Sequence, residues 1–217
     1  MRVVEIELAA ASDNPLLTPD GRLLSVGNFD ASGLAAALDY MRISLAQALT
    51  LSCERVQKLL SNWHTGLPTG LRERDDLSED ALSIFGHGAA ALAAEARLLA
   101  QPVSFELPTS SIAESIEDRV TMASLAARRL DEQANLALRL ATVEMLCAAQ
   151  AIDLRGRSAA LGAATHALYT LVRSHIPPLR AGDSPVTDLD ALLTAFEASL
   201  AGTPDELTYQ TTRNAVD

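Results

Sequence analysis

The feature that most constrains the fold is a long stretch without proline or glycine, from about Ile116 to about Leu154. A single helix over this stretch would be about 58 Å long, at a rise of 1.5 Å per residue. A helix of that length needs partners along its whole apolar stripe, because most helical stability in proteins comes from packing. The stretch therefore predicts an all-α fold, an elongated multi-helix bundle, and it favours an oligomer.

Apolar residues recur at steps of three and four from Leu34 to Leu60, which marks one face of a second long helix. The whole chain, 1–217, is predicted to be one helical domain. Further helices are predicted over 1–11, from Ser78 as the cap to about Ala100, over 158–176 and over 187–201. Loops are predicted at 12–33, with a short hairpin turned at Pro19-Asp20-Gly21, at 61–77 and at 101–115, and a flexible tail at 203–217.

Composition narrows the possible partners. The net charge of −11 argues against nucleic acid, because a phosphate backbone attracts basic surfaces. Cys53 and Cys147 lie in predicted helices and are interpreted as small buried hydrophobic residues of a reducing compartment. No signal peptide and no apolar run of membrane-spanning length is visible, so we expect a cytoplasmic protein without a membrane partner.

Patterns that bind metals or phosphates are missing from the sequence. It contains no H-E-x-x-H, no C-x-x-C, no glycine-rich phosphate loop and no serine nucleophile elbow. The histidines have no carboxylate or cysteine four residues away; they are His64, His87, His166 and His175. We therefore expect no metal site and interpret the histidines as surface or packing residues.

Short motifs follow one another in a fixed order over about residues 4–155. They are Ser12-Asp13-Asn14-Pro15-Leu16, Gly27-Asn28-Phe29, Leu51-Ser52 with Glu54-Arg55, Gly66-Leu67-Pro68, the run from Ala89 to Ser104, Pro108-Thr109-Ser110 with Glu117-Asp118, and Ala148-Ala149-Gln150 with Asp153-Leu154-Arg155. This ordered set resembles the C-terminal part of the aromatic amino-acid ammonia-lyases, most closely histidine ammonia-lyase.

The resemblance implies a helical fold, usually a homotetramer whose active sites combine residues of several subunits. The reaction it implies is elimination of ammonia from an L-amino acid, although a few relatives are aminomutases. The family's electrophile is a methylidene-imidazolone, made from the protein's own Ala-Ser-Gly. In the family that triad precedes the S-D-N-P-L motif, so this chain resembles only the second portion. We expect it to carry no such cofactor, no catalytic residue of its own and no activity alone, with a separate N-terminal portion as a possible partner.

The resemblance also implies substrate-binding residues. Phe29, next to Asn28, stands where the family's phenylalanine lines the pocket; hydrophobic packing is an equally good interpretation of this residue. Glu117 stands where the family's glutamate approaches the substrate, and compensation of a helix dipole is its alternative. Asp30 and Arg119 replace histidines of the family motifs, which weakens the assignment to histidine as substrate. These departures favour the alternative of a non-catalytic helical scaffold that forms oligomers or serves as a partner subunit.

Ala31-Ser32-Gly33 has the composition of the cyclising triad but lies at a different place in the sequence. It opens the first long helix, where Asp30 or Ser32 makes a good N-cap and Gly33 is tolerated in the first turn. We therefore predict a helix start here. Cyclisation is the alternative, and it would remove two waters from the intact mass.

Overall fold

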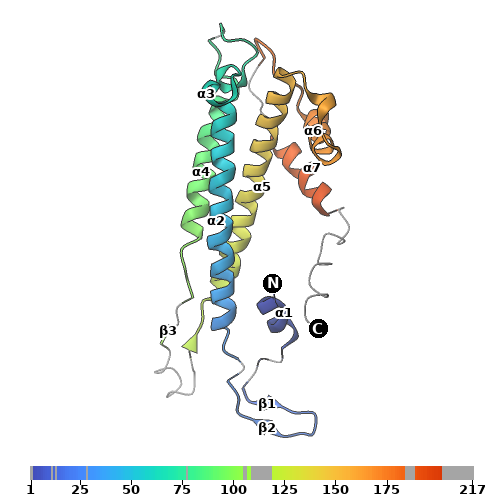
Figure 1. Cartoon of the computed structure of the whole chain (residues 1–217). Helices are drawn as coiled ribbons and strands as arrows, with labels where there is room; N and C mark the ends of the chain where they lie inside the picture. The colour runs from blue at the N-terminus through green and yellow to red at the C-terminus, as the bar shows by residue number, and fades with distance from the viewer. Residues whose placement is uncertain are drawn as a thin grey trace, which may run out of the picture. The chain divides into compact units, whose positions relative to one another are not determined.

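The computed structural model describes residues 2–10, 12, 14–27, 29–76, 78–104, 107–108, 119–183 and 189–201. The prediction of an all-α fold is confirmed, because helices hold most of these residues and the strands form only two-residue pairs (Figure 1). The helices are α1 (Arg2–Ala9), α2 (Ser32–Leu60), α3 (Asn62–Thr65), α4 (Ser83–Leu99), α5 (Ala123–Leu154), α6 (Ala163–His175) and α7 (Leu189–Ala201). Short 3₁₀ segments lie at Thr69–Leu71 and Ser158–Ala160.

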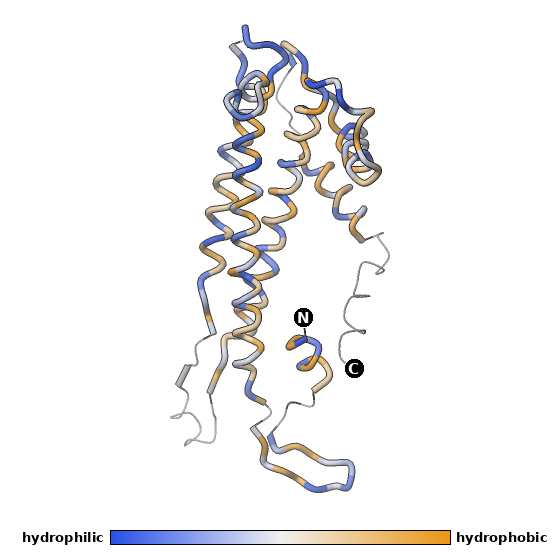
Figure 2. The backbone as a smooth tube through the Cα atoms, viewed as in Figure 1, coloured by the Kyte–Doolittle hydropathy of each residue, from blue (hydrophilic) through white to orange (hydrophobic). Residues whose placement is uncertain are grey.

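The chain divides into two compact units. Unit 1 comprises Met1–Thr50 with Ala93–Ala137, and unit 2 comprises Leu51–Leu92 with Leu138–Asp217. Each of the helices α2, α4 and α5 contributes one part of its length to unit 1 and the other part to unit 2. Along these three helices, hydrophobic residues recur with hydrophilic ones between them (Figure 2), as expected for helices that bury one face.

A short hairpin precedes α2 in unit 1. Strands β1 (Leu16–Leu17) and β2 (Leu23–Leu24) pair antiparallel. The turn lies where Pro19-Asp20-Gly21 predicts it: the Gly21 N–H donates to the Thr18 carbonyl at 2.8 Å, and Gly21 has a φ of 80°. Glycine suits this turn because it adopts a positive φ without steric cost.

Helix α5 is shorter than the sequence predicts. A start near Ile116 is wrong, because Arg119–Val120 is strand β4, paired antiparallel with β3 (Leu107–Pro108), and the helix begins at Ala123. Pairing with a distant segment overrides local helix propensity here. The helix is 32 residues long, which corresponds to about 48 Å.

Helix α4 also begins later than predicted, at Ser83 rather than at Ser78. Ala81 has a φ of 44°, which a right-handed helix does not allow. The Leu82 N–H donates instead to the Gly70 carbonyl at 2.9 Å. The chain before α4 is thus fixed by a contact with the Thr69–Leu71 segment. At the other end of the chain, α6 is shorter than the predicted 158–176, because its first turn is replaced by the separate 3₁₀ segment Ser158–Ala160.

Each unit has its own apolar core. In unit 1, Leu38, Val103 and Ala126 are buried together, with Leu34, Met122, Leu125 and Leu130 packed around them. In unit 2 the largest fully buried apolar side chains include Val56, Leu71, Leu82, Leu140, Leu146, Val172 and Leu192. Burying such a side chain stabilises a fold by about 1.5–3 kcal/mol.

The cysteines are free thiols inside helices, as predicted; Cys147 is buried and Cys53 is half-buried. Burial, helped by the nearby Glu144 carboxylate, raises the pKa of Cys147 to about 12, so it stays protonated and unreactive. Among the described residues, α5 alone is long and apolar enough to cross a bilayer. It also carries the buried Gln133, Thr142 and Gln150, and a buried core helix passes the same length and composition test.

Candidate functional site

Of the three predicted substrate-binding residues, the structure describes Phe29. Its side chain is 36% exposed, in the turn where the Asp30 N–H donates to the Gly27 carbonyl at 3.3 Å. Asn28 and Glu117 lie outside the described residues. The role of these residues in binding therefore stays a prediction.

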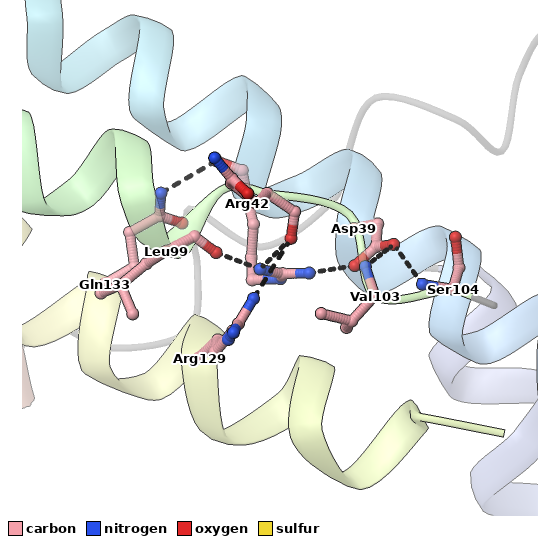
Figure 3. A network of polar contacts seen from close by, with 8 residues as sticks. Asp39, Arg42, Leu99, Val103, Ser104, Arg129 and Gln133 are labelled. Carbon is pink, nitrogen blue, oxygen red and sulfur yellow. Dashed lines mark hydrogen bonds and ion pairs between the residues drawn. The ribbon is translucent and has the colours of Figure 1, made fainter. Parts of the chain in front are cut away.

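A buried polar cluster in unit 1 lies where α2, the end of α4 and the beginning of α5 meet (Figure 3). Asp39 and Arg42 are three residues apart on α2, so they share one helix face and form an ion pair. Gln133 projects from α5. We call Asp39, Arg42 and Gln133 the Asp39 cluster; all three side chains are at least 95% buried.

Both carboxylate oxygens of Asp39 accept hydrogen bonds. Oδ2 accepts from the backbone N–H groups of Val103 and Ser104, each at 2.8 Å, and Oδ1 accepts from Arg42. Burial acts to raise the pKa of Asp39, but the hydrogen bonds from Ser104, Val103 and Arg42 outweigh it, so the pKa lies below its ordinary value. Asp39 is therefore an ionised acceptor and not a proton donor at neutral pH.

Arg42 and Gln133 bind backbone carbonyls at the end of α4. The Arg42 guanidinium donates to the Leu99 carbonyl and, at 3.1 Å, to the Gln101 carbonyl. Gln133 Nε2 donates to the carbonyls of Arg42, at 3.0 Å, and Ala96, at 2.8 Å. The last carbonyls of a helix lack partners within the helix, and Arg42 supplies one for Leu99 at the end of α4. The Ala96 carbonyl also accepts from the Ala100 N–H, so Gln133 adds a second donor there. The cluster thus fixes the main chain from Leu99 to Ser104.

A second polar network lies in unit 2. Gln150 donates from Nε2 to the carbonyls of Leu71, at 3.3 Å, and Leu179, at 3.0 Å, and its Oε1 accepts from the Leu179 N–H at 3.0 Å. Asp153 accepts from Arg173 Nε at 2.7 Å and from the Tyr169 hydroxyl. The hydrogen bond to Asp153 raises the pKa of Tyr169. We call Gln150, Asp153, Tyr169 and Arg173 the Gln150 network; it fastens the chain that follows α6.

Further motif residues hold unit 2 together. Glu144 accepts from Ser52 Oγ at 2.5 Å and from Arg55 at 2.5 Å (Nε) and 2.9 Å (Nη2). Arg155 donates to the Thr65 carbonyl at 2.6 Å. The motifs around Ser52 and Arg155 therefore make structural bonds in this part of the chain.

An apolar recess of about 90 Å³ lies between α5 and α6 in unit 2. Its walls include Met145, Ile152, Leu168 and Tyr169. No carboxylate, guanidinium or ammonium group is among its lining residues, so it cannot neutralise the charged groups of an amino acid.

The described residues contain no group of three or more histidine, cysteine, aspartate or glutamate side chains able to hold a metal ion. Ala31-Ser32-Gly33 does not fit the imidazolone. Ring closure would bring the Gly33 nitrogen onto the Ala31 carbonyl carbon, but that carbonyl accepts from the Ala35 N–H at 2.9 Å in the first turn of α2. The Asp30 carboxylate also accepts from the Ser32 N–H at 2.8 Å. This triad is a capped helix start, and Asp30 supplies the capping acceptor.

The sequence of residues 1–174 matches the profile of the family described as aromatic amino acid lyase. The chain belongs to this family. It is 40% identical to a histidine ammonia-lyase of Burkholderia mallei over 171 residues, which are 78% of this chain and 33% of that protein. The chain thus spans about a third of the length of this curated relative.

Solved structures of aromatic amino acid lyase relatives share the fold. Histidine ammonia-lyase from Trypanosoma cruzi superposes with a TM-score of 0.76 at 29% identity, over 87% of this chain and 37% of that one. Phenylalanine aminomutase from Pantoea agglomerans superposes with a TM-score of 0.79 at 26% identity, over 92% of this chain and 38% of that one. These relatives include both lyases and an aminomutase.

The sequence-based interpretation of this lyase-family chain missed the Asp39 cluster. One signal was available: Asp39 and Arg42 lie beside the apolar stripe of α2, next to Leu38 and Met41. A charged pair at that position must be buried with partners or displaced to the surface. Gln150 was recognised as part of a motif, but its partner Leu179 could not be read from the sequence.

Proposed function

We propose that this chain is the helical C-terminal part of an ammonia-lyase, which eliminates ammonia from an L-amino acid when the enzyme is complete. The match of residues 1–174 to the aromatic amino acid lyase family carries the proposal. Histidine ammonia-lyases are among its relatives, and the long helices α2, α4 and α5 agree with the fold of the solved relatives. In the complete enzyme the chain contributes pocket residues and the oligomer core.

The pocket residues in this proposal are Phe29, Asn28 and Glu117. An exposed Phe29 next to a capped helix start suits a pocket wall, since residues held close to a regular helix are placed more accurately than residues far out on loops. Glu117 contacts the substrate side chain, as the corresponding glutamate does in histidine-specific members of the family.

The chain alone is inert in this proposal, and the protein-derived methylidene-imidazolone belongs to the preceding part of a complete enzyme. That group supplies the electron sink for the elimination, and positioning residues do not replace it. The capped helix start at Ala31-Ser32-Gly33 supports this assignment, because the triad of this chain is committed to a different structure.

The proposed partners are further copies of the chain, in a dimer or tetramer, a separate N-terminal lyase portion and an amino-acid substrate, in the cytoplasm. Large apolar side chains exposed on the helices support an assembly. Within unit 1 these include Tyr40, Ile43 and Leu98; within unit 2 they include Leu51, Trp63, Ile84, Leu168 and Leu200. The net charge of −11 supports the exclusion of nucleic acid, and the buried polar residues of α5 support the exclusion of a membrane.

Incubation with L-histidine, L-phenylalanine and L-tyrosine, followed by absorbance of the unsaturated acid, tests the first half of the proposal. We expect no turnover by the purified chain. Sustained turnover by the chain alone would overturn this expectation, and loss of two waters in the intact mass would identify the source of that activity.

Mixing the chain with the N-terminal two thirds of a histidine ammonia-lyase tests the second half. We expect elimination activity in the mixture, and Glu117→Gln should lower it at least tenfold, because the neutral amide cannot replace a carboxylate acceptor. Glu114→Gln is the matched control, with the same chemical change three residues away. Equal losses in both variants would refute the role of Glu117.

A second candidate is a non-catalytic helical scaffold that retains the family fold. One observation favours it: Asp30, which replaces a histidine of the family motif, caps α2 with its carboxylate. In that case the mixture stays inactive while the chain still assembles, as measured by light scattering. Activity of the wild-type mixture excludes the scaffold.

A further inference from the structure

The Asp39 cluster holds the segment Leu99–Ser104 through its backbone. Two carbonyls of the segment accept from Arg42, and two N–H groups donate to Asp39 (Figure 3). Arg129 adds a longer contact to the Gln101 carbonyl, at 3.5 Å. Contacts to main-chain atoms fix the path of the chain whatever its side chains are.

We propose that Asp39 and Arg42 are positioning residues that set where the main chain leaves α4, and thereby where the chain leading on to Glu117 begins. This inference rests on the proposed function and deepens it. Neither residue touches substrate; both act through the segment Leu99–Ser104.

Stability alone does not account for the cluster. Replacing a buried ion pair with apolar side chains of similar volume is often neutral or stabilising. The cluster also leaves Arg42 Nε and Gln133 Oε1 buried without a hydrogen-bond partner among the described residues, which is unfavourable. A simple apolar core would avoid both the burial of charged groups and the unpartnered polar atoms.

The Asp39 cluster is better explained by the geometry that it imposes on the main chain. Two successive N–H groups, of Val103 and Ser104, converge on one oxygen of Asp39, which fixes the orientation of both peptide planes. The planar guanidinium of Arg42 fixes the spacing of the Leu99 and Gln101 carbonyls. Such accuracy matters in an enzyme, because a displacement of about 1 Å can lower the rate about 100-fold.

Asp39→Asn is the sharpest test, because it preserves shape. Each oxygen of Asp39 faces only donors, so either orientation of the asparagine places its NH₂ group against a donor. Asp153→Asn is the matched control. Both oxygens of Asp153 also face hydrogen-bond donors, but this residue lies in unit 2. Leu49→Ala, a core truncation about three turns further along α2, controls for a general loss of stability.

Hydrogen exchange of the full chain, measured by mass spectrometry, gives the first readout. In Asp39→Asn we expect exchange in Leu99–Ser104 to become at least tenfold faster, while the remainder of α2 changes less than twofold. Asp153→Asn and Leu49→Ala should leave the segment unchanged. Unchanged exchange in Asp39→Asn, or an equal rise in Leu49→Ala, would overturn the proposal.

Arg42→Lys covers the case in which Asp39→Asn does not fold. Lysine keeps the positive charge beside Asp39, but its single nitrogen cannot reproduce the guanidinium fork. We expect a rise in exchange of at least threefold, confined to the same segment. A uniform rise across unit 1, or none, would refute the positioning role.

Activity of the mixture with an N-terminal lyase portion gives the second readout. We expect Asp39→Asn to lower kcat/KM at least tenfold, with oligomer size unchanged, whereas Leu49→Ala lowers it less than threefold. Wild-type-like kcat/KM in Asp39→Asn would refute the link to catalysis. If the wild-type mixture is inactive, the proposed function fails, and the exchange data still decide whether Asp39 and Arg42 position the segment.

Discussion

The Asp39 cluster of unit 1 and the Gln150 network of unit 2 solve one problem with different chemistry. Both fasten irregular main chain to helices through buried side chains. In the Asp39 cluster a charged pair does this, with side chains 0% and 5% exposed. In the Gln150 network a neutral amide makes most of the backbone contacts, beside one from Arg173 to the Ile176 carbonyl, and the ion pair of Arg173 with Asp153 is 11% and 17% exposed. The difference teaches that a fully buried ion pair must stay complete, whereas an ion pair that water reaches tolerates the loss of one partner better.

The largest effect should follow from breaking the charged pair. Arg42→Ala leaves the Asp39 charge buried without its counterion, and we expect it to lower the free energy of unfolding by about 3–5 kcal/mol. Arg173→Ala should cost less, because water reaches the Asp153 carboxylate. Urea denaturation followed by circular dichroism measures both variants.

Arg55→Ala provides the exposed reference for this pair of variants. Arg55 is 57% exposed in its ion pair with Glu144, so we expect a loss of about 1 kcal/mol or less. Equal losses of unfolding free energy for Arg42→Ala and Arg55→Ala would mean that burial does not decide how much an ion pair contributes to stability.

Gly70→Ala tests the Gln150 network through the main chain that it binds. Gly70 has a φ of 71°, and an added Cβ would lie 2.7 Å from the Asp80 carbonyl oxygen. Its neighbour Leu71 is the residue whose carbonyl binds Gln150. We expect a loss of about 2–4 kcal/mol, from the positive φ and the clash together. Thermal unfolding should show a lower Tm for the variant.

Gly88→Ala is the matched control, because a Cβ there meets nothing within 4 Å and the residue lies inside α4. Alanine should raise stability there by about 0.5–1 kcal/mol. We expect the two substitutions to change stability in opposite directions. An unchanged stability of Gly70→Ala would show that the main chain bound by the Gln150 network adapts to an added side chain.

A sequence reveals structure that depends on neighbouring residues better than structure that depends on contacts between distant residues. The apolar steps from Leu34 to Leu60 predict α2 well, because helix periodicity is a property of neighbouring residues. The start of α5 could not be found in this way, since it depends on the pairing of Arg119–Val120 with Leu107–Pro108. The start of α4 depends likewise on the Gly70 carbonyl.

The same distinction applies to the candidate site. Family motifs pointed to Phe29, Asn28 and Glu117, whereas no motif pointed to the Asp39 cluster. Arg42 finds its carbonyl acceptors 57 and 59 residues further along the chain. A burial pattern predicts that such a side chain needs partners, but it does not identify them.

The buried amides offer a finer comparison. Gln150 uses both ends of its amide, with Nε2 and Oε1 each bonded, while Gln133 Oε1 has no partner among the described residues. Gln150→Leu should therefore lose about 2–3 kcal/mol, because the backbone groups of Leu71 and Leu179 lose their amide partner. Gln133→Leu should lose about 1–2 kcal/mol, because the Ala96 carbonyl still accepts from the Ala100 N–H. Chemical denaturation measures both losses of unfolding free energy. A larger loss for Gln133→Leu than for Gln150→Leu would contradict this expectation.

The smallest effects should appear in the pH dependence, with opposite directions in the two regions. The pKa of Asp39 is lowered in the folded chain, so its contribution is present above about pH 4, the unfolded value, and is lost as the pH falls through the folded pKa. The pKa of Tyr169 is raised, so its contribution is present below about pH 10 and is lost as the pH rises through the folded pKa.

Two variants separate these contributions. The difference in unfolding free energy between wild type and Asp39→Asn should shrink in acid, and the difference between wild type and Tyr169→Phe should shrink in alkali, by about 1 kcal/mol or less for the half-buried Tyr169. Urea denaturation at pH 3, 7 and 10.5 measures both differences. If both shrink on the same side of neutrality, the charged cluster and the amide network are not chemically distinct. Because each variant is compared with wild type at the same pH, titration of groups that the substitution leaves unchanged cancels, and the two directions report the two regions separately.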